Sequence, residues 1–312
     1  MARPLRIEYP GAFYHVTSRG NEQKDVFKSQ KDREKFLSYL ESATERYSAI
    51  IHAYCLMSNH YHLLLETPAG NLSQIMRHVN GAYTTYFNIK RKRAGHLFQG
   101  RFKAILVEAD EYATELSRYI HLNPVRAGIV DRPEEYQWSS YRYFIGHDKT
   151  PEWLNTGFIL GYFGKRAVEA GEKYRAFVED LTGNEYESPL QGTVGSSILG
   201  SAGFIEEITT VHVKAMEADK NIPALRQLTF RPSPEEIINV VKTIFVENEK
   251  LARQVSIHIC HKFSGVRLRE IGSLFAVRET GIAEASRRFS LKMGEDKKLR
   301  ELVDRVKGEL KI

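Results

Sequence analysis

The sequence has little cysteine and no long hydrophobic run. Only Cys55 and Cys260 occur among 312 residues, far apart and each in an apolar stretch. This predicts two buried, reduced thiols instead of a disulfide framework, and no cysteine or histidine spacing typical of a zinc finger is present. No stretch approaches 18 consecutive apolar residues, and the N-terminus lacks the apolar segment of a secretory signal. We therefore expect a cytoplasmic protein with no membrane partner.

The composition is that of a folded protein with a basic surface. Hydrophobic residues make up 42% and aromatic residues 11% of the chain, which is long enough for two domains. The formal net charge is +6, and the sequence pI is about 9.1. This balance is compatible with a polyanionic partner but does not by itself require one.

The first 148 residues alternate between strand and helix patterns. Strands are expected at about 13–18, 50–57, 59–66 and 102–107. Helices are expected after the capping residues at 29–32, with an apolar face from Phe36 to Ala43, and at about 71–89 and 110–123. Asp110 is the expected N-cap of the third helix, and Pro124 is expected to stop it. This order predicts an α+β fold, the ferredoxin-like split βαβ arrangement, with an antiparallel sheet and helices on one face.

The rest of the chain divides into a connector and a helical domain. Residues 149–229 contain a Gly/Ser-rich stretch at 191–197 and predict a partly helical connector. From Ser233 onward the pattern is helical, with Pro234 at the first helical position and Glu236 completing a capping box. Residues 230–312 therefore predict an all-α domain.

Two histidines occupy alternate positions in the third expected strand. His60 and His62 share one face with Leu64 and Glu66, because strand side chains alternate with a period of two. Two imidazoles on one face of a strand can bind a divalent metal. The same pattern also fits a solvated, hydrogen-bonded pair, and the motif alone does not decide between them.

The third expected helix carries a polar stripe. Tyr112, Glu115, Tyr119 and Asn123 follow each other at spacings of three and four residues. A tyrosine phenol can attack a phosphodiester when a metal polarises the phosphate. An amide oxygen one turn from that tyrosine could complete a two-histidine metal site. Packing of the tyrosines at a core edge, with asparagine before proline as a helix terminator, explains the pattern equally simply.

A basic segment lies between the second helix and the fourth strand. It contains six cations without an acid, and Phe98 and Phe102 are interleaved with them. Cations pair with phosphates and aromatic rings stack on unpaired bases, so the segment predicts DNA binding. The six cations are Lys90, Arg91, Lys92, Arg93, Arg101 and Lys103.

Three motifs in this part of the chain resemble a known family. They are His60-Tyr61-His62, residues 97–103 (LFQGRFK) and residues 119–128 (YIHLNPVRAG). Over residues 5–145 the chain resembles the single-tyrosine HUH transposases, and specifically the branch of REP-associated tyrosine transposases.

The resemblance implies a metal-dependent domain that cuts and rejoins single-stranded or hairpin DNA. By this resemblance His60, His62 and Asn123 are the metal ligands and Tyr119 is the catalytic tyrosine, with Tyr112 as the runner-up. It implies Mg²⁺ or Mn²⁺ as cofactor, a 5′-phosphotyrosine intermediate and a free 3′-hydroxyl. It also suggests a homodimer.

The helical domain contains a helix-turn-helix pattern. Expected helices at 251–260 and 267–275 are followed by a break at 276–277 and a helix from 279 to 290. The last of these would enter the major groove of duplex DNA, where Arg278, Glu284, Arg287 and Arg288 could make contacts. An ordinary helical bundle fits the pattern equally well.

Residues 230–310 are similar to the C-terminal DNA-binding domain of DnaA. The similarity is carried by Ala252-Arg253-Gln254 and by residues 268–272 (LREIG). DnaA proteins continue after the signature arginine with Asp-His-Thr-Thr, whereas Arg278 is followed here by Glu-Thr-Gly-Ile. The scaffold is similar but the base-reading residues differ, so we expect a different duplex site.

The combined prediction is a DNA transposase or nickase with a duplex-DNA anchor. The main alternative is a non-catalytic, sequence-specific DNA-binding regulator that retains the transposase scaffold. A third is a metal-dependent phosphodiesterase that uses water and in which the tyrosine is structural.

Overall fold

The computed structural model divides the chain into two compact units, residues 1–228 and 229–312. It describes residues 6–183, 188–194, 197–213, 232–246, 248–264, 266 and 268–310. Each unit has a hydrophobic core of its own. Over the described ranges, no helix is both long and apolar enough to cross a membrane.

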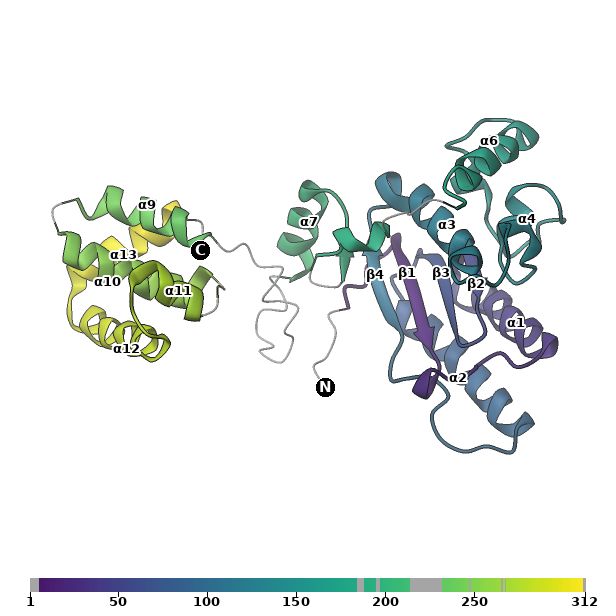
Figure 1. The fold of residues 1–312 in the computed structure, drawn as a ribbon, viewed down its shortest axis with the longest axis horizontal. Helices are drawn as coiled ribbons and strands as arrows, with labels where there is room; N and C mark the ends of the chain where they lie inside the picture. The colour runs from purple at the N-terminus through teal and green to yellow at the C-terminus, as the bar shows by residue number, and fades with distance from the viewer. Residues whose placement is uncertain are drawn as a thin grey trace. The chain divides into compact units, whose positions relative to one another are not determined.

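The first unit is built on a mixed five-stranded sheet. Its strands are β1 (Ala12–Arg19), β2 (Ile50–Leu56), β3 (His60–Thr67), β4 (Lys103–Val107) and β5 (Ile198–Leu199). They lie in the order β2-β3-β1-β4-β5, and Figure 1 shows β1 and β3 at the centre. The first four strands pair antiparallel in the ferredoxin-like order, which confirms that part of the prediction. β5 pairs parallel with β4, so the sheet is not purely antiparallel as expected.

Helices cover both faces of this sheet, and the expectation of helices on one face was wrong. α1 (Gln30–Tyr47) and α2 (Leu72–Lys90) share a core with Leu63 and Leu65. α3 (Ala109–Arg126) shares a second core with Leu64, which points the other way from the same strand. β3 is thus apolar on both faces, and each face requires a cover.

Much of the predicted connector belongs to the first unit. Its helices add side chains to the core around α3, among them Ile159, Tyr174 and Val178, and β5 extends the sheet. The helices here are α5 (Gly157–Leu160), α6 (Ala167–Glu179) and α7 (Ala202–Ile208), and α4 (Tyr141–Phe144) lies just before the connector. Short helical turns also occur at Asn21–Gln23, Pro133–Glu135, Pro189–Gly192 and Thr209–Val213. Residues 184–187, 195–196 and 214–229 of the predicted connector lie outside the described residues.

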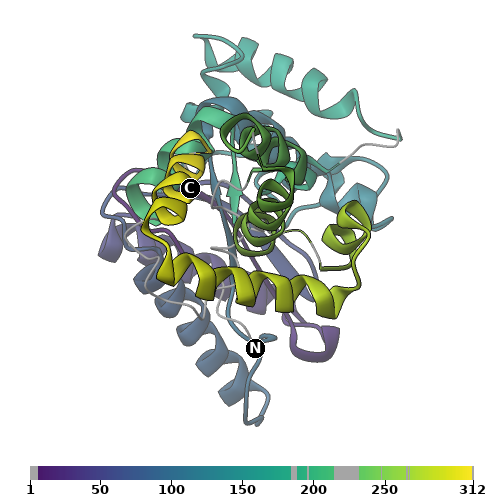
Figure 2. The ribbon, with the colours of Figure 1, turned by 90° about the vertical axis from the view of Figure 1, so that its left-hand side faces the viewer.

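The second unit is all-α. It consists of α9 (Pro234–Ile244), α10 (Glu249–Ile259), a π turn at Cys260–Ser264, α11 (Leu268–Phe275), α12 (Glu279–Glu295) and α13 (Lys297–Glu309). These helices are coloured green to yellow in Figures 1 and 2. The capping box of Ser233 and Glu236 is present at the start of α9, as expected. α11 and α12 are joined by a tight turn in which Ala276 has a φ of 50°, in the left-handed region.

The helix α3 differs from its prediction at both ends. Its N-cap is Glu108 instead of Asp110, and it continues past Pro124 to Arg126. Proline removes a single backbone donor, which the last turn of this helix tolerates. As a result Tyr119 and Asn123 lie on one uninterrupted helix.

Candidate active site

The two histidines of the motif lie on the face of β3 that α3 covers. His60 is the first residue of the strand and is half-buried, whereas His62 is 6% exposed. Their rings lie 5.1 Å apart between centroids. His62 is flanked on the neighbouring strand by Thr17 of β1. The period-two alternation inferred from the sequence therefore holds, and the pair is fixed on a central strand.

Tyr119 reaches this pair from α3. Its ring is edge-on to the ring of His62, with centroids 5.7 Å apart and planes at 83°. The guanidinium of Arg126, two turns further along the helix, lies 5.2 Å from the centre of the tyrosine ring. The half-buried tyrosine ring therefore lies against His62 and a cation, with part of its surface exposed to solvent.

Asn123 follows Tyr119 by one helical turn. Its Nδ2 donates a hydrogen bond of 2.7 Å to the backbone carbonyl of Tyr119. This bond holds the amide against the helix and leaves the Oδ1 atom as the potential ligand. Tyr112 lies two turns before Tyr119, and no ring contact joins it to a histidine in the described part of the chain.

Each motif histidine has a hydrogen-bond partner at Nδ1. For His60 the partner is the side-chain oxygen of Asn59, at 2.6 Å. For His62 it is Nε2 of His15, a residue of β1, at 3.0 Å. When Nδ1 of an imidazole carries the proton, Nε2 holds the lone pair that a metal requires.

The environment keeps these imidazoles neutral. Burial lowers the pKa of His62 well below its usual value, and the nearby His15, His60 and Arg126 lower it further. Burial, and then Arg19, lowers the pKa of His60. A metal binds the neutral ring, so both groups are in the required protonation state at neutral pH.

These residues fit a divalent metal. Nδ1 of each ring is held by a partner, and Nε2 of each ring can bind a metal when Nδ1 carries the proton. Within the described residues, no group of three or more histidine, cysteine, aspartate and glutamate side chains could hold a metal. A site at this place would therefore depend on the two imidazoles and a ligand of another type, for which the Asn123 amide is the predicted candidate.

Sequence reasoning missed His15 and Arg126. Both contact the predicted nucleophile, and His15 also contacts a predicted ligand. The signal for His15 was its place in the strand next to β3 of the ferredoxin-like order. The register that sets His15 opposite Leu64, two pairs from His62, could not be read from the sequence.

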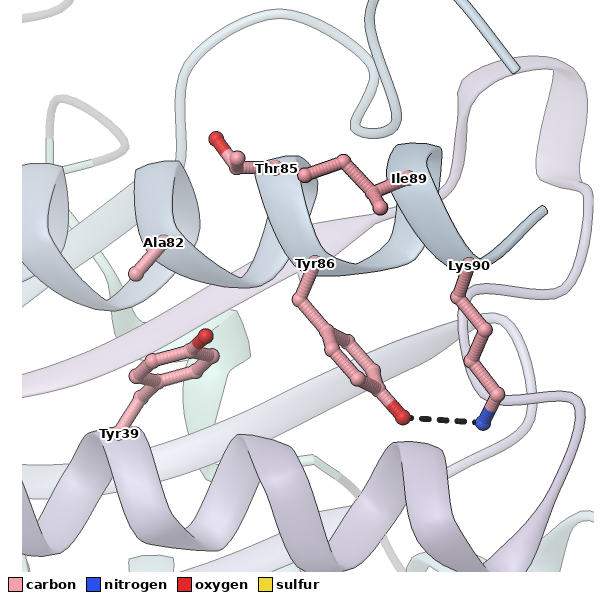
Figure 3. A pocket seen from close by; sticks show the side chains of 6 residues that line it. All are labelled: Tyr39, Ala82, Thr85, Tyr86, Ile89 and Lys90. Atoms are coloured by element: carbon pink, nitrogen blue, oxygen red, sulfur yellow. Dashed lines mark hydrogen bonds between the residues drawn. The ribbon is translucent and has the colours of Figure 1, made fainter. Parts of the chain in front are cut away.

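Two of the six predicted DNA-binding cations, although exposed themselves, pair with a buried carboxylate. Lys90 Nζ lies 2.5 Å from Oδ1 of Asp32, and Arg91 lies 2.7 Å from its other oxygen. Lys90 also donates a hydrogen bond to the Tyr86 hydroxyl. Figure 3 shows this bond at the edge of a pocket lined by residues of α1 and α2. Asp32 is fully buried, so these two cations balance an interior charge and would have to leave it to meet a phosphate.

The other four cations, Lys92, Arg93, Arg101 and Lys103, are exposed. Arg93 donates to the backbone oxygen of His96, in the loop after α2. Phe98 and Phe102 are only 6% and 8% exposed and belong to the core, so they are not surface rings on which bases could stack. The basic part of the segment is a surface feature, and its aromatic part is structural.

The three predicted cations of the second unit lie at α12. Arg278 is its N-cap residue, and Arg287 and Arg288 both pair with Glu284 on the exposed side of the helix. The Arg253 guanidinium donates a hydrogen bond to the backbone carbonyl of Phe275, the last residue of α11, next to the turn. α11, the turn and α12 have the order expected of a helix-turn-helix.

Comparison with known proteins supports the resemblance over the first unit. Residues 9–123 match the family model described as "Transposase IS200 like". A Haemophilus influenzae protein assigned as a REP-associated tyrosine transposase is 26% identical over 129 residues, which cover 38% of this chain and 73% of that protein. A solved structure of a REP-associated tyrosine transposase bound to a REP hairpin matches with a TM-score of 0.42 and 16% identity, covering 50% of this chain and 92% of the other.

The matched residues include strands β1 to β4, most of α3, and His60, His62, Tyr119 and Asn123, but not β5 or Arg126. The expected similarity to the tyrosine transposases is thereby confirmed at the level of the IS200-like family for residues 9–123, and it supports a DNA-processing role. The similarity of residues 230–310 to DnaA stays a prediction.

Proposed function

We propose that the first unit cuts and rejoins single-stranded DNA through a covalent bond between Tyr119 and a 5′-phosphate. The observation that carries this proposal is the contact between the Tyr119 ring and the His62 ring, across the face that α3 shares with β3. A tyrosine beside two neutral imidazoles is the set of groups that metal-assisted phosphoryl transfer needs. The family match over residues 9–123 supports the same chemistry.

His60, His62 and Asn123 would hold the metal, Mg²⁺ or Mn²⁺. When bound, it would supply a Lewis acid for the scissile phosphate. Two imidazoles and an amide oxygen are softer than an all-oxygen set, which favours Mn²⁺ in affinity. Arg126 lies beside the tyrosine ring with its positive charge and would draw the phosphate toward the phenol.

Tyr119 would perform the substitution at phosphorus. Its phenolic oxygen forms the new P–O bond and loses its proton, while the bond from phosphorus to the 3′-oxygen breaks and that oxygen takes up a proton. The phosphate stays attached to the tyrosine and to the 5′ end of the downstream strand. A 3′-hydroxyl that later attacks the linkage reverses these steps, so no nucleotide cofactor is needed.

The proposed DNA partner is a hairpin with single-stranded flanks, the kind of DNA that the resemblance of residues 5–145 implies. The exposed Lys92, Arg101 and Lys103 supply charge for its phosphates. The α11–α12 pair of the second unit would bind duplex DNA beside it. A homodimer, suggested by the resemblance, is part of the same proposal.

The test is a covalent-adduct assay. Hairpins with randomised single-stranded flanks carry a label at the 3′ end, because the downstream strand is the one retained on tyrosine. We expect a denaturation-resistant labelled protein band with Mn²⁺, none with chelator, and none for Tyr119→Phe. Tyr112→Phe, on the same helix, is the matched control and should form the adduct.

Each contrary result indicates a particular alternative. An adduct retained in Tyr119→Phe and lost in Tyr112→Phe would move the nucleophile to Tyr112. Cleavage without an adduct would favour the metal-dependent hydrolase. DNA binding without cleavage in any metal would favour the regulator.

A further inference from the structure

His15 connects the two halves of the candidate site. It is 2% exposed, on the central strand β1, and its Nε2 lies 3.0 Å from Nδ1 of His62. The two rings are stacked, with centroids 5.2 Å apart and planes 14° from parallel. The other contact of His15 is with Tyr119, edge-on at 6.0 Å. One buried side chain therefore touches both a predicted ligand and the predicted nucleophile.

The direction of the His15–His62 hydrogen bond decides which nitrogen of His62 can bind a metal. Only one of the two facing nitrogens carries a hydrogen when both rings are neutral. If Nδ1 of His62 donates, its Nε2 presents a lone pair and His15 accepts through Nε2. If His15 donates instead, the proton of His62 lies on Nε2 and blocks that atom. The distance of 3.0 Å fits either direction of the bond, but only the first arrangement leaves Nε2 of His62 free for a metal.

We propose that His15 is a positioning residue that accepts the hydrogen bond from Nδ1 of His62 and so keeps Nε2 of His62 free for the metal. This rests on the metal site of the proposed function. The stacking of the rings would fix the plane of His62 as well as its tautomer. His15 itself does not touch the metal, because its Nε2 is engaged by His62.

The test compares two substitutions of His15. His15→Phe keeps a stacked ring but has no acceptor, whereas His15→Gln places an amide oxygen near the former position of Nε2. Loss of such a partner lowers metal affinity by about 10–100-fold. We expect that loss of Mn²⁺ affinity in His15→Phe, measured from the electron paramagnetic resonance signal of free Mn²⁺, and recovery to within a few-fold of wild type in His15→Gln.

His52→Phe is the matched control. His52 is also a buried histidine of the sheet, stacked on Phe13 with centroids 5.0 Å apart, and its hydrogen-bond partners are Asn155 and Glu66. Its loss should leave Mn²⁺ affinity unchanged. This control separates a specific effect of His15 from the general effect of removing a buried imidazole.

A second readout follows the tautomer directly. Two-bond ¹H–¹⁵N spectra distinguish the Nδ1–H and Nε2–H forms of imidazole, and the His62 signals are identified by their absence in His62→Ala. We expect the Nδ1–H form in the metal-free wild type and in His15→Gln, and a mixture or the Nε2–H form in His15→Phe. A purely structural role of His15 would leave this signature unchanged.

The outcomes separate the two proposals. Wild-type affinity in His15→Phe, or an unchanged His62 tautomer, would overturn the role of His15 while leaving the metal site intact. Equal Mn²⁺ affinity in wild type and His62→Ala would overturn the metal site of the proposed function, and the role of His15 with it.

Discussion

Asp32 is a carboxylate with no exposed surface, at the start of α1. It accepts hydrogen bonds from Lys90, Arg91 and the backbone of Lys28. Burial alone would raise the pKa of this group, but these hydrogen bonds outweigh it and lower the pKa to about 2. The cluster ties the end of α2 to the start of α1, close to the exposed basic loop.

Replacing this carboxylate should destabilise the first unit. We expect Asp32→Asn to lower its free energy of unfolding by about 2–3 kcal/mol at neutral pH, because two charged donors lose their ionic acceptor. Both tryptophans, Trp138 and Trp153, lie in the first unit, so their fluorescence during urea unfolding reports on that unit alone. The exposed Asp25→Asn is the matched control and should change little.

The effect of Asp32 should depend on pH in one direction. Its folded-state pKa of about 2 lies below the usual value of 3.8, so its stabilisation is present above about pH 4 and is lost as the pH falls toward 2. The difference between wild type and Asp32→Asn should therefore be constant from pH 7 to 5 and smaller at pH 3. A difference that grew on acidification would contradict the assigned role.

The site residues differed in whether their role could be predicted from the sequence. His60 and His62 were visible because alternation within one strand is local. His15 was not, because its role depends on the register between two strands and on a ring-to-ring hydrogen bond. Lys90 and Arg91 were predicted to be DNA-binding surface cations. Their ion pairs with Asp32 could not be inferred from local sequence, because Asp32 is almost 60 residues away.

At the scale of elements, local sequence patterns predicted the type and order of the helices and strands. They were less accurate for the residues at which elements end and for the sheet face that each helix covers. The four main strands and three main helices of residues 12–126 follow the predicted order. The second covered face was missed because the apolar residues of α3 were assigned to the same sheet face as those of α1 and α2. The strand β5 has two residues, too few for a periodic pattern to exist.

The turn between α11 and α12 depends on a glycine. A side chain at Gly272 would place its Cβ 2.5 Å from the backbone oxygen of Val277, which cannot move without shifting the turn. We expect Gly272→Ala to destabilise the second unit by about 1–3 kcal/mol. The measurement is the far-ultraviolet circular dichroism of unfolding, with tryptophan fluorescence unchanged because the second unit contains no tryptophan.

Gly294 provides the matched substitution. It lies in α12, where an added Cβ meets no atom within 4 Å. Gly294→Ala should therefore be neutral or stabilise the unit by about 0.5–1 kcal/mol through the higher helix propensity of alanine. Equal effects of the two substitutions would mean that the turn does not need Gly272.

At the scale of the whole molecule, the chain combines an α+β unit with a separate all-α unit. The composition and the change of pattern after residue 230 predicted this division. The assignment of residues 149–213 was less accurate, because the apolar residues of a short helix such as α5 give no clear period. Their place became evident only from the core around α3.

The second unit should contribute to DNA affinity through α12. We expect Arg287→Ala combined with Arg288→Ala in the full chain to weaken binding to hairpins with a duplex flank. The slope of log affinity against log salt should flatten by about 0.9 for each phosphate that these two arginines neutralise in the wild type. Adduct formation by Tyr119 on a hairpin without that flank should be unaffected.

Glu284→Gln gives the opposite prediction. Glu284 pairs with both arginines, and its neutralisation frees them and removes a negative charge from the same helix face. Fluorescence anisotropy with the duplex-flanked hairpin should show tighter binding. Unchanged affinity in both variants would exclude this face of α12 as the DNA contact.

The contact between α3 and β3 lies within a single chain, which affects how many DNA ends one copy of the protein can hold. His62 and Tyr119 belong to one polypeptide, so one copy contains the proposed nucleophile together with a proposed ligand. If Tyr119 acts as proposed, each copy can hold one DNA end at a time. Exchange of two strands would then require either two copies working together or two successive reactions on one copy, with a free 3′-hydroxyl releasing the first end before the second is cut.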